Sequence, residues 1–564
     1  MNGQNHDPLT ANVEEPLVVV DENAVAWADE ADVVVVGFGG AGVVAALQIR
    51  EYGGSVIALD RFAGGGATEK SGGVVYAGGT RFQKAAGYDD TADEMFKYLK
   101  HEGTPVRDET LRRFCDESSA SMEWLGGFGV EFGSTAFEER IAYPPDGYFL
   151  YYTGMEKFRD HAARPSPRGH RTVGKGPTGR FYFPPLREAA SKAGVRFVPH
   201  APVRRLVMTG DGRVLGVEIQ EIPADQQAKH LEIFKKVDPY KIQNGGPAEE
   251  AIAECAAFER GMPQIRKLIR GRRGVILSAG GYNYNLKLFG RYRPILPRVY
   301  KNIVRGGSMG CDGSGIELGV TGGGGLSHMD RLFITKAISP PNAFVHGILV
   351  NVEGKRFITE DAYVGNVGCT LSEQPEEGIA WLILDSPTFW QGIRQATWPL
   401  RNIISWYGGP ALLNILVGGT RRARTLKELA RKCGVDAAAL EATVAAYNTH
   451  AAQGTDPEQG KLKQHIRPQD KPAYYALNFS LKNRWGFSGC MPYGGLTVDE
   501  NTGNVTRPDG SIITGLYAAG RTAVGICSES NFSGLSIADT IFSGRRAGRA
   551  VMQGGSAVAA SKVA

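Results

Sequence analysis

The chain has 564 residues, more than one simple core usually holds, so its length predicts two or more structural units. Hydrophobic residues make up 42% and charged residues 22%, the balance of an ordinary soluble globular protein. The formal net charge is only +5 and no dense basic block is present, so nothing indicates a nucleic-acid partner.

The cysteine pattern and the lengths of the apolar runs indicate the cellular compartment that we expect for the protein. Seven cysteines are scattered without a C-x-x-C pair, which predicts neither a metal site nor a disulfide framework and fits a reducing compartment. Residues 1–30 do not read as a secretory signal, and no window approaches about 18 uninterrupted apolar residues. We therefore expect a cytoplasmic protein without a transmembrane segment, with peripheral contact at the inner face of the membrane if its substrate is apolar.

The segment from Ala31 to Asp60 predicts a βαβ unit that binds a dinucleotide. A run of valines precedes Gly37, Gly39 and Gly42 in the spacing G-x-G-x-x-G; a helical pattern and a second strand follow, and the strand ends in Asp60. The glycines would allow a tight turn, close approach to a pyrophosphate and close helix packing. Asp60 lies where a carboxylate accepts a hydrogen bond from a ribose hydroxyl. An ordinary βαβ turn is the alternative.

The segments that follow predict a loop that wraps around the cofactor, several helices and a β-hairpin. Residues 63–80 are dense in glycine directly after the ribose-binding acid, which favours a wrap around the cofactor over a free loop. Residues 90–125 predict two amphipathic helices. Aromatic residues crowd the stretch 143–153, where turn residues favour a pocket although such clusters are more often core. Residues 195–220 predict a small meander with a hairpin, and 224–270 a charged helical excursion without an assigned role.

Composition changes twice in the second half of the chain. Residues 309–325 form another glycine-rich turn into a helix, which Asp312 could cap. From about 326 to 481 the chain becomes rich in tryptophan and in long helical patterns, which predicts a separate domain. A glycine-rich strand at 515–520 and a closing helix at 536–548 complete the chain.

Several stretches resemble one flavoprotein superfamily, the FAD-dependent fumarate reductase/succinate dehydrogenase flavoproteins. They run in family order from residue 31 to 548: VVVVGFGGAGVVAA, GGGATEKSGG, VILSAGGYNYN, CDGSGIELG, GILVNVEGKRFITEDAYVG and GLYAAGRTAVGICSESNFSGLSIADTIFSGRRAG. Within the superfamily, YPPDGYFLYYTG, PSPRGH, EDAYVG and AAGRTAVGI resemble the 3-ketosteroid dehydrogenases, most closely their Δ4-(5α) branch.

The resemblance implies an α/β fold in two parts. A Rossmann-like FAD-binding domain would comprise residues 27–325 and 482–553, and an inserted α+β catalytic domain at 326–481 would cap the flavin. Residues 1–26 lack periodicity and would form a disordered arm, and residues 554–564 a frayed tail.

The resemblance also implies that the dinucleotide is FAD. Because Ser71, and no histidine, follows Lys70 where some flavoproteins attach their cofactor, we expect non-covalent binding. The start of the helix near Ser536 would stabilise the reduced flavin through its dipole. The residues expected to hold FAD are Gly37, Gly39, Gly40, Ala41, Gly42, Asp60, Arg61, Gly66, Ala67, Thr68, Ser71, Gly72, Gly73, Val203, Ala279, Gly280, Asp312, Gly520, Ser536 and Ile537.

Desaturation beside a ketone needs a base, a donor that stabilises the enolate, and a hydride acceptor. The resemblance places the catalytic tyrosine at Tyr493 and a second active-site tyrosine at Tyr363, although either could be a core aromatic residue. Two positions after Tyr493 the Δ4 branch carries a serine that could relay the proton. Here that position is Gly495, a pattern closer to the Δ1 branch.

The expected activity is tyrosine-assisted desaturation of a 3-ketosteroid, with the Δ4 bond preferred and a Δ1-dehydrogenase as the alternative. A fumarate-type reductase of a polar enoate and a non-catalytic flavin or electron-relay protein are further alternatives. No dicarboxylate-binding pattern surrounds His328 or His346, which favours the steroid. An external acceptor, such as a quinone or a dye, would take the electrons. The residues expected to contact the steroid are Tyr151, Tyr152, Phe532, Ser533 and Gly534.

Overall fold

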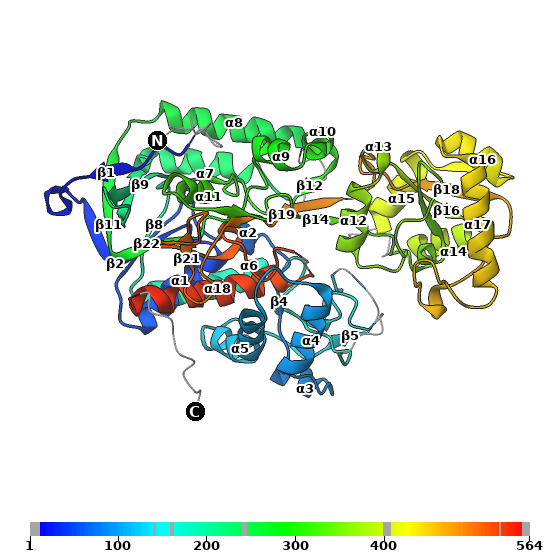
Figure 1. Cartoon of the computed structure of the whole chain (residues 1–564), viewed down its shortest axis with the longest axis horizontal. Helices are drawn as coiled ribbons and strands as arrows, with labels where there is room; N and C mark the ends of the chain where they lie inside the picture. Colours follow the sequence, from blue (N-terminus) through cyan, green and yellow to red (C-terminus); the bar gives the residue numbers. More distant parts are fainter. Residues whose placement is uncertain are drawn as a thin grey trace.

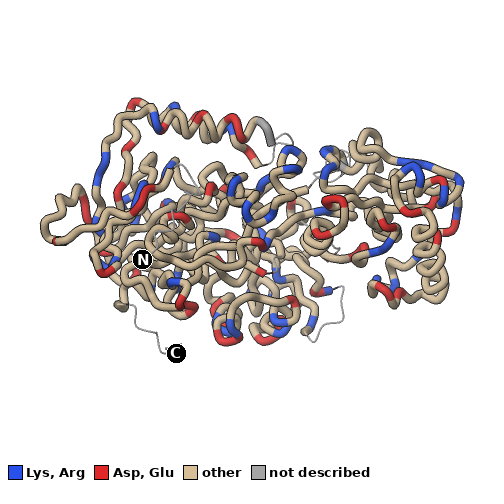
Figure 2. The backbone as a smooth tube through the Cα atoms, turned by 45° about the horizontal axis from the view of Figure 1, so that its top comes forward, with Lys and Arg blue, Asp and Glu red and all other residues tan. Residues whose placement is uncertain are grey.

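The computed structural model shows an elongated chain with two lobes (Figure 1). It describes residues 12–138, 141, 143–157, 163–239, 245–398, 408–486, 488–529 and 532–554. The larger lobe contains the first and the last described segments of the chain, and the smaller lobe, drawn mainly in yellow, lies at the other end of the long axis. Among the described residues, acidic and basic residues are interspersed along the backbone of both lobes (Figure 2).

A nine-stranded sheet forms the centre of the larger lobe. Its strands are β1 (Leu17–Val19), β2 (Asp29–Val36), β3 (Val56–Leu59), β8 (Arg196–Val198), β9 (Val203–Thr209), β10 (Val214–Gln220), β11 (Arg266–Leu277), β21 (Asn504–Thr506) and β22 (Ile512–Ala518). The order is β1-β9-β10-β11-β2-β3-β8, and β22 joins β21 to β11. Because β11, β2, β3 and β8 are parallel neighbours, their carboxyl ends meet at one edge, where α/β sheets bind ligands.

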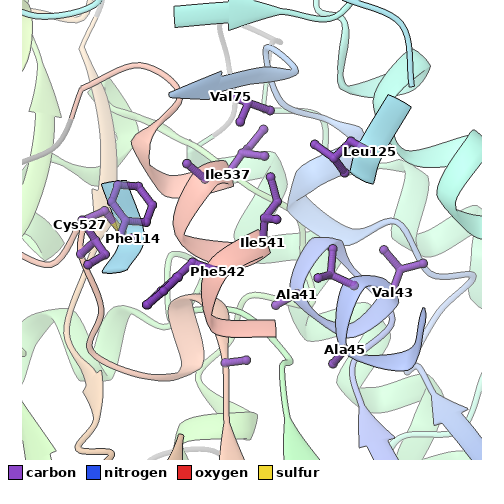
Figure 3. Packing of buried hydrophobic residues seen from close by; sticks show 14 of the residues in the cluster. Ala41, Val43, Ala45, Val75, Phe114, Leu125, Cys527, Ile537, Ile541 and Phe542 are labelled. Atoms are coloured by element: carbon purple, nitrogen blue, oxygen red, sulfur yellow. The ribbon is translucent and has the colours of Figure 1, made fainter. Parts of the chain in front are cut away.

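Two helices, α1 (Gly40–Glu51) and α18 (Leu535–Met552), pack together on the sheet. The second half of β2 and all of β3 are buried apolar runs, as parallel strands covered on both faces require. On its outer side α18 contacts α5 (Asp108–Gly127), where the rings of Phe542 and Phe114 meet edge to face at 5.6 Å (Figure 3). This packing holds the N-terminal ends of α1 and α18 side by side.

The other elements of the larger lobe surround this centre. Before β11 they are α2 (Gly66–Glu69), β4 (Val74–Tyr76), α3 (Arg81–Ala85), α4 (Ala92–Glu102), β5 (Ala136–Phe137), β6 (Leu150–Tyr151), β7 (Gly169–Arg171), α6 (Gly179–Lys192), α7 (Gln227–Lys235) and α8 (Gly245–Gly261). After β11 they are α9 (Leu286–Tyr292), α10 (Ile295–Val299), β12 (Val304–Arg305) and α11 (Ser314–Thr321). Strands β4, β7, β6 and β5 form a second, small sheet.

The smaller lobe is an antiparallel sheet covered by helices. Its strands, in the order β15-β16-β18-β17, are β15 (Ile348–Asn351), β16 (Ala380–Leu384), β18 (Tyr474–Asn478) and β17 (Arg421–Ala423). Its helices are α12 (Val364–Ser372), α13 (Pro375–Gly378), α14 (Ser386–Thr397), α15 (Gly408–Val417), α16 (Leu426–Cys433) and α17 (Ala437–Ala451).

Two strand pairs join the outgoing and the returning chain between the lobes. Strand β14 (Leu332–Thr335) pairs antiparallel with β19 (Gly489–Pro492), which also pairs with β12. Strand β13 (Leu326–Ser327) pairs with β20 (Gly495–Leu496). Strands from opposite sides of the predicted domain boundaries near 326 and 482 therefore pair with each other. The boundaries themselves stay predictions.

The α/β fold with a mainly parallel sheet is confirmed, and one predicted segment differs. Residues 1–26 were expected to be disordered, but Leu17–Val19 form β1, which pairs in parallel with β9 at the edge of the sheet. Backbone pairing orders this segment although its sequence has no periodicity. Residues 1–11 and most of the predicted tail, 555–564, lie outside the described residues. Among the described helices, none is long and apolar enough to cross a membrane.

Candidate active site

A cavity of about 920 Å³ lies where the carboxyl ends of the parallel strands, the start of α1 and the start of α18 meet. Residues from Asn12 to Thr540 line it, and both halves of the chain contribute. Every residue expected to hold FAD lies in this lining except Gly42. Gly42 is buried in α1, where a Cβ atom would lie 1.9 Å from the carbonyl oxygen of Gly37.

The glycine-rich turn forms a cradle that side chains would fill. Gly37 has φ of +95°, and a Cβ atom there would lie 2.6 Å from the Cα atom of Ala279. Helix α1 begins after Gly39, with no side chain capping its first N–H groups. These donors and the helix dipole suit a pyrophosphate, so the residues present fit a dinucleotide.

Asp60 and Arg61 lie at the end of this cradle, and both are held by the protein itself. The backbone N–H groups of Phe38 and Phe62 donate to the Asp60 carboxylate at 2.9 and 2.8 Å, and burial raises the pKa of Asp60. Arg61 pairs with Glu259 at 2.6 Å and with Asp312 at 2.8 Å. Asp312 also accepts the N–H of Ser314, the first residue of α11, at 2.9 Å, but the N-cap residue of this helix is Gly313 and not Asp312 as predicted.

Three potential metal ligands lie beside Arg61. One donor atom each of His230, Cys255 and Glu259 lies within 4.8 Å of the others. However, Arg61 and Arg204 contact the two carboxylate oxygens of Glu259 at 2.6 and 3.0 Å. Two guanidinium groups at these distances would repel a cation, so the contacts of Glu259 are those of an ion-pair network.

Tyr363 marks the other end of the cavity. Its side chain is 5% exposed and lines the cavity together with Phe333, Phe532 and Ser533. The backbone N–H of Ser533 donates to the Tyr363 hydroxyl oxygen at 3.0 Å. The ring of Phe532 lies 5.8 Å away. The rings of Phe333, Tyr363 and Phe532 therefore meet at this end, which we call the aromatic end, whereas the cradle end is rich in glycine and polar groups.

Tyr493 lies next to this aromatic end but does not line the cavity. Its ring centre is 6.2 Å from that of Phe333, which is also 6.2 Å from Tyr363. The Tyr493 hydroxyl is buried without a hydrogen-bond partner among the described residues. Burial raises the pKa of Tyr493 well above its ordinary value, so the phenol is neutral at neutral pH.

Gly495 has no space for a side chain. A Cβ atom there would lie 2.7 Å from the carbonyl oxygen and 3.0 Å from the carbonyl carbon of Thr522. Because both atoms belong to the backbone, they cannot move aside as a side chain could. A serine relay at this position is therefore sterically excluded in this chain.

The predicted steroid contacts divide into two groups. Phe532, Ser533 and Gly534 line the cavity. Tyr151 and Tyr152 lie behind it: the Tyr151 hydroxyl is 2.6 Å from Ser533 Oγ, and Tyr152 borders a small neighbouring pocket with Tyr363. Burial raises the pKa of Tyr152 to about 12.

The sequence did not single out three residues at this end, Phe333, Met491 and Thr335, although they line the cavity. They lie on the paired strands β14 and β19. Short apolar strands of this kind carry no signal that separates a cavity wall from ordinary core.

Comparison with known proteins agrees with this geometry. Residues 32–534 match the family described as FAD binding domain. The chain is 34% identical to the 3-oxo-5-alpha-steroid 4-dehydrogenase of Comamonas testosteroni over 92% of its length and 98% of that protein. It is 27% identical to a 3-oxosteroid 1-dehydrogenase of Mycobacterium tuberculosis, covering 88% of this chain and 93% of that one.

A solved structure gives the same result at the level of the fold. The 3-ketosteroid-Δ4-(5α)-dehydrogenase of Rhodococcus jostii RHA1, in complex with 4-androstene-3,17-dione, matches with a TM-score of 0.77 and 30% identity. The match covers 96% of this chain and all of that one. The chain therefore belongs to the FAD-binding flavoprotein family of the fumarate reductases and succinate dehydrogenases, as an FAD-dependent oxidoreductase homologous to the 3-ketosteroid dehydrogenases.

Proposed function

We propose that the protein is a 3-ketosteroid dehydrogenase that introduces a carbon–carbon double bond next to the 3-keto group, with the 4,5 bond preferred. One observation carries the proposal: a single cavity joins the glycine-lined cradle to an aromatic end that holds Tyr363. An apolar slot with few polar groups suits a steroid ketone. The names of the Comamonas and Rhodococcus relatives support the same substrate class.

The residues of the cradle would hold FAD without a covalent bond. When bound, FAD supplies the acceptor for a hydride from the β carbon of the ketone. Ser71, at the position of covalent attachment in some flavoproteins, donates its hydroxyl to the carbonyl oxygen of Thr68 at 2.7 Å. Denaturing the protein with acid should therefore release all of the flavin into the supernatant; flavin retained in the precipitate would contradict non-covalent binding.

The two tyrosines would divide the proton chemistry. Neutral Tyr493 suits a hydrogen-bond donor that stabilises the oxygen of the developing enolate. Tyr363 suits the proton acceptor, because the N–H of Ser533 at its oxygen stabilises negative charge that develops there. The hydroxyl groups of Ser533 and Tyr151, 2.6 Å apart, would replace the serine relay that Gly495 excludes.

Single-turnover product analysis tests the proposal. Anaerobic protein with bound FAD is mixed with a saturated 5α-3-ketosteroid, and the product is identified by mass spectrometry and NMR. The expected result is bleaching of the flavin and one equivalent of the 4-ene-3-ketone. A flavin spectrum that stays unchanged with every 3-ketosteroid tried would overturn the proposed function.

A Δ1-dehydrogenase is the second candidate, and Gly495 is the observation that favours it. A glycine two positions after Tyr493 is closer to the pattern of the Δ1 branch. The backbone of Thr522 leaves no space at this position for the serine of the Δ4 branch. The same experiment separates the two activities, because the Δ1 product carries its vinyl protons on carbons 1 and 2.

A fumarate-type reductase has less support from the site. His328 lies 3.6 Å from Glu529, and His346 contacts the carbonyl oxygen of His465 at 2.8 Å. Neither histidine is among the residues that line the cavity. Oxidation of reduced viologen by fumarate would nevertheless identify this activity. The quinone or dye-like acceptor, the cytoplasmic location and the contact with the inner face of the membrane stay predictions.

A further inference from the structure

The excursion between β10 and β11 covers the end of the cavity that contains Asp60. Its helices α7 and α8, both green, lie on the outer side of the larger lobe, with α8 outermost (Figure 1). Phe234 of this excursion lines the cavity together with Arg61 and Arg204. By its position after β3, Asp60 marks this as the adenosine end of the site.

Glu259, near the end of α8, is the centre of the contacts at this end. Its side chain is 1% exposed. One oxygen lies 2.6 Å from Arg61 Nε and 3.1 Å from His230 Nε2, and the other lies 3.0 Å from Arg204 Nη2. Burial alone would raise the pKa of Glu259, but the charges of Arg61 and Arg204 and the hydrogen bond to His230 hold it well below its ordinary value.

Both arginines reach the cavity from different strands. Arg61 follows β3 and also pairs with Asp312 at 2.8 Å. Arg204 lies on β9 and donates to Gln220 Oε1 at 2.9 and 2.7 Å. The single carboxylate of Glu259 thus joins two guanidinium groups that would otherwise repel each other in a buried position.

An apolar contact extends the same wall. The ring of Phe234 stacks on that of Phe62 at 4.4 Å, and the N–H of Phe62 holds the Asp60 carboxylate at 2.8 Å. Lys70, from the glycine-rich wrap, lies over the Phe234 ring at 4.4 Å and donates to the carbonyl oxygen of Val237 at 2.8 Å. The excursion therefore touches Phe62, whose N–H holds Asp60, and also Arg61 and the wrap.

We propose that the described residues of this excursion, 224–239 and 245–261, form the wall that closes the adenosine end of the cofactor site, with Glu259 as the positioning residue that holds Arg61 and Arg204 against the bound dinucleotide. Glu259 acts through these two side chains and does not itself line the cavity. The proposal rests on FAD binding and is independent of which substrate the enzyme desaturates.

The test compares ligands that contain or lack the adenosine half. Apoprotein is prepared from the full chain, and the dissociation constants of FAD, ADP and FMN are measured by calorimetry. Glu259→Gln should raise the Kd of FAD and of ADP by a similar factor, about 10- to 100-fold, and leave that of FMN unchanged. Glu254→Gln is the matched control, because Glu254 lies on the same helix but pairs with Lys236 at the surface.

Two outcomes would overturn the proposal. One is an equal loss of FAD and FMN affinity, which would indicate a general structural role of Glu259. The other is an unchanged Kd of FAD in a folded Glu259→Gln protein. If that variant does not fold, Phe234→Leu replaces it: it removes the stack on Phe62 without changing the charge. It should raise the Kd of FAD and ADP about two- to tenfold but not that of FMN, and the absence of this difference would equally contradict the proposal.

Discussion

The hydroxyl groups of Tyr363 and Tyr493 occupy different environments although both rings contact Phe333. The Tyr363 oxygen receives a backbone N–H, whereas the Tyr493 oxygen has no partner among the described residues. An unpaired buried hydroxyl is costly unless a ligand satisfies it, and this cost supports the proposed role of Tyr493, which lies beside the cavity lining, as a hydrogen-bond donor to the ketone. Either phenol can then contribute to the reaction without being needed for the fold.

Removal of each hydroxyl should therefore reduce turnover and spare the fold. Tyr363→Phe and Tyr493→Phe should each lower kcat about 10²- to 10⁴-fold, the usual contribution of a positioned acid or base. Steady-state kinetics with a 3-ketosteroid checks this, with flavin content measured in parallel. Tyr182→Phe is the matched control, since its buried hydroxyl also lacks a partner among the described residues but belongs to α6 and not to the aromatic end around Phe333. A variant of Tyr363 or Tyr493 with wild-type kcat would exclude that residue from catalysis.

Lys336 is a second unusual residue, a fully buried amine between two residues that line the cavity, Thr335 and Ala337. Its Nζ atom lies 3.0 Å from Ser488 Oγ and 3.3 Å from the carbonyl oxygen of Gly486. Burial lowers the pKa of Lys336 to about 7. An unfolded lysine has a pKa of about 10.4, so between these values the unfolded chain binds a proton that the folded chain does not.

The free energy of unfolding should consequently rise with pH in this window. The unfolded state binds more protons, so the slope is positive, at most about 1.4 kcal/mol per pH unit. Lys336→Met should remove this contribution, so that the difference in stability between wild type and variant changes steadily from pH 7.5 to pH 9.5. Urea unfolding at several pH values measures it. Parallel curves for the two proteins would show that the amine stays charged in the folded state.

At the scale of elements, the contact between α1 and α18 decides the shape of the cradle. A Cβ atom on Gly544 would lie 2.7 Å from the carbonyl oxygen of Ala41, and one on Gly548 would lie 3.0 Å from that of Ala45. Ala41 lines the cavity, as do Ser536 and Ile537 at the start of α18. A side chain between the helices would therefore displace groups expected to hold the cofactor.

Gly544→Val should separate these helices and weaken FAD binding. Overpacking of this kind costs about 1–3 kcal/mol, enough to lower both the Tm and the flavin content of the purified protein. Gly127→Val is the matched control, because among the described residues no atom beyond its chain neighbours and its own helix backbone lies within 4 Å of a Cβ atom at that glycine. Flavin absorbance and thermal unfolding measure the two effects. Equal flavin content in both variants would show that α18 can shift without disturbing the site.

At the scale of the molecule, the sequence predicts the cofactor end of the cavity far better than the substrate end. Gly37, Gly39 and Asp60 lie in one short motif, so local spacing is sufficient to find them. Phe333, Tyr363 and Met491 come together only because β14 pairs with β19 across the inserted lobe. Local patterns also could not show that Thr522 blocks position 495, or that β1 pairs with β9.

A shared cavity would link the binding of FAD thermodynamically to the binding of the proposed steroid. The lining runs from the glycine cradle to residues of the inserted region, including Tyr363, Gln395 and Pro340, without a wall between them. A bound flavin would therefore form part of the surface that a steroid contacts. Binding of either ligand must then strengthen binding of the other by the same factor.

This linkage predicts a difference between the apoprotein and the FAD-loaded protein. Excess FAD, at about 100 times its Kd, should stabilise the folded chain by about 2.7 kcal/mol and raise the Tm. 4-Androstene-3,17-dione should raise the Tm of the FAD-loaded protein further, and should raise that of the apoprotein much less, because the flavin surface is then missing. Thermal unfolding with each ligand alone and with both measures the coupling. Equal shifts by the steroid with and without FAD would mean that the two sites are independent, and would place the steroid outside the cavity that Tyr363 and the glycine cradle share.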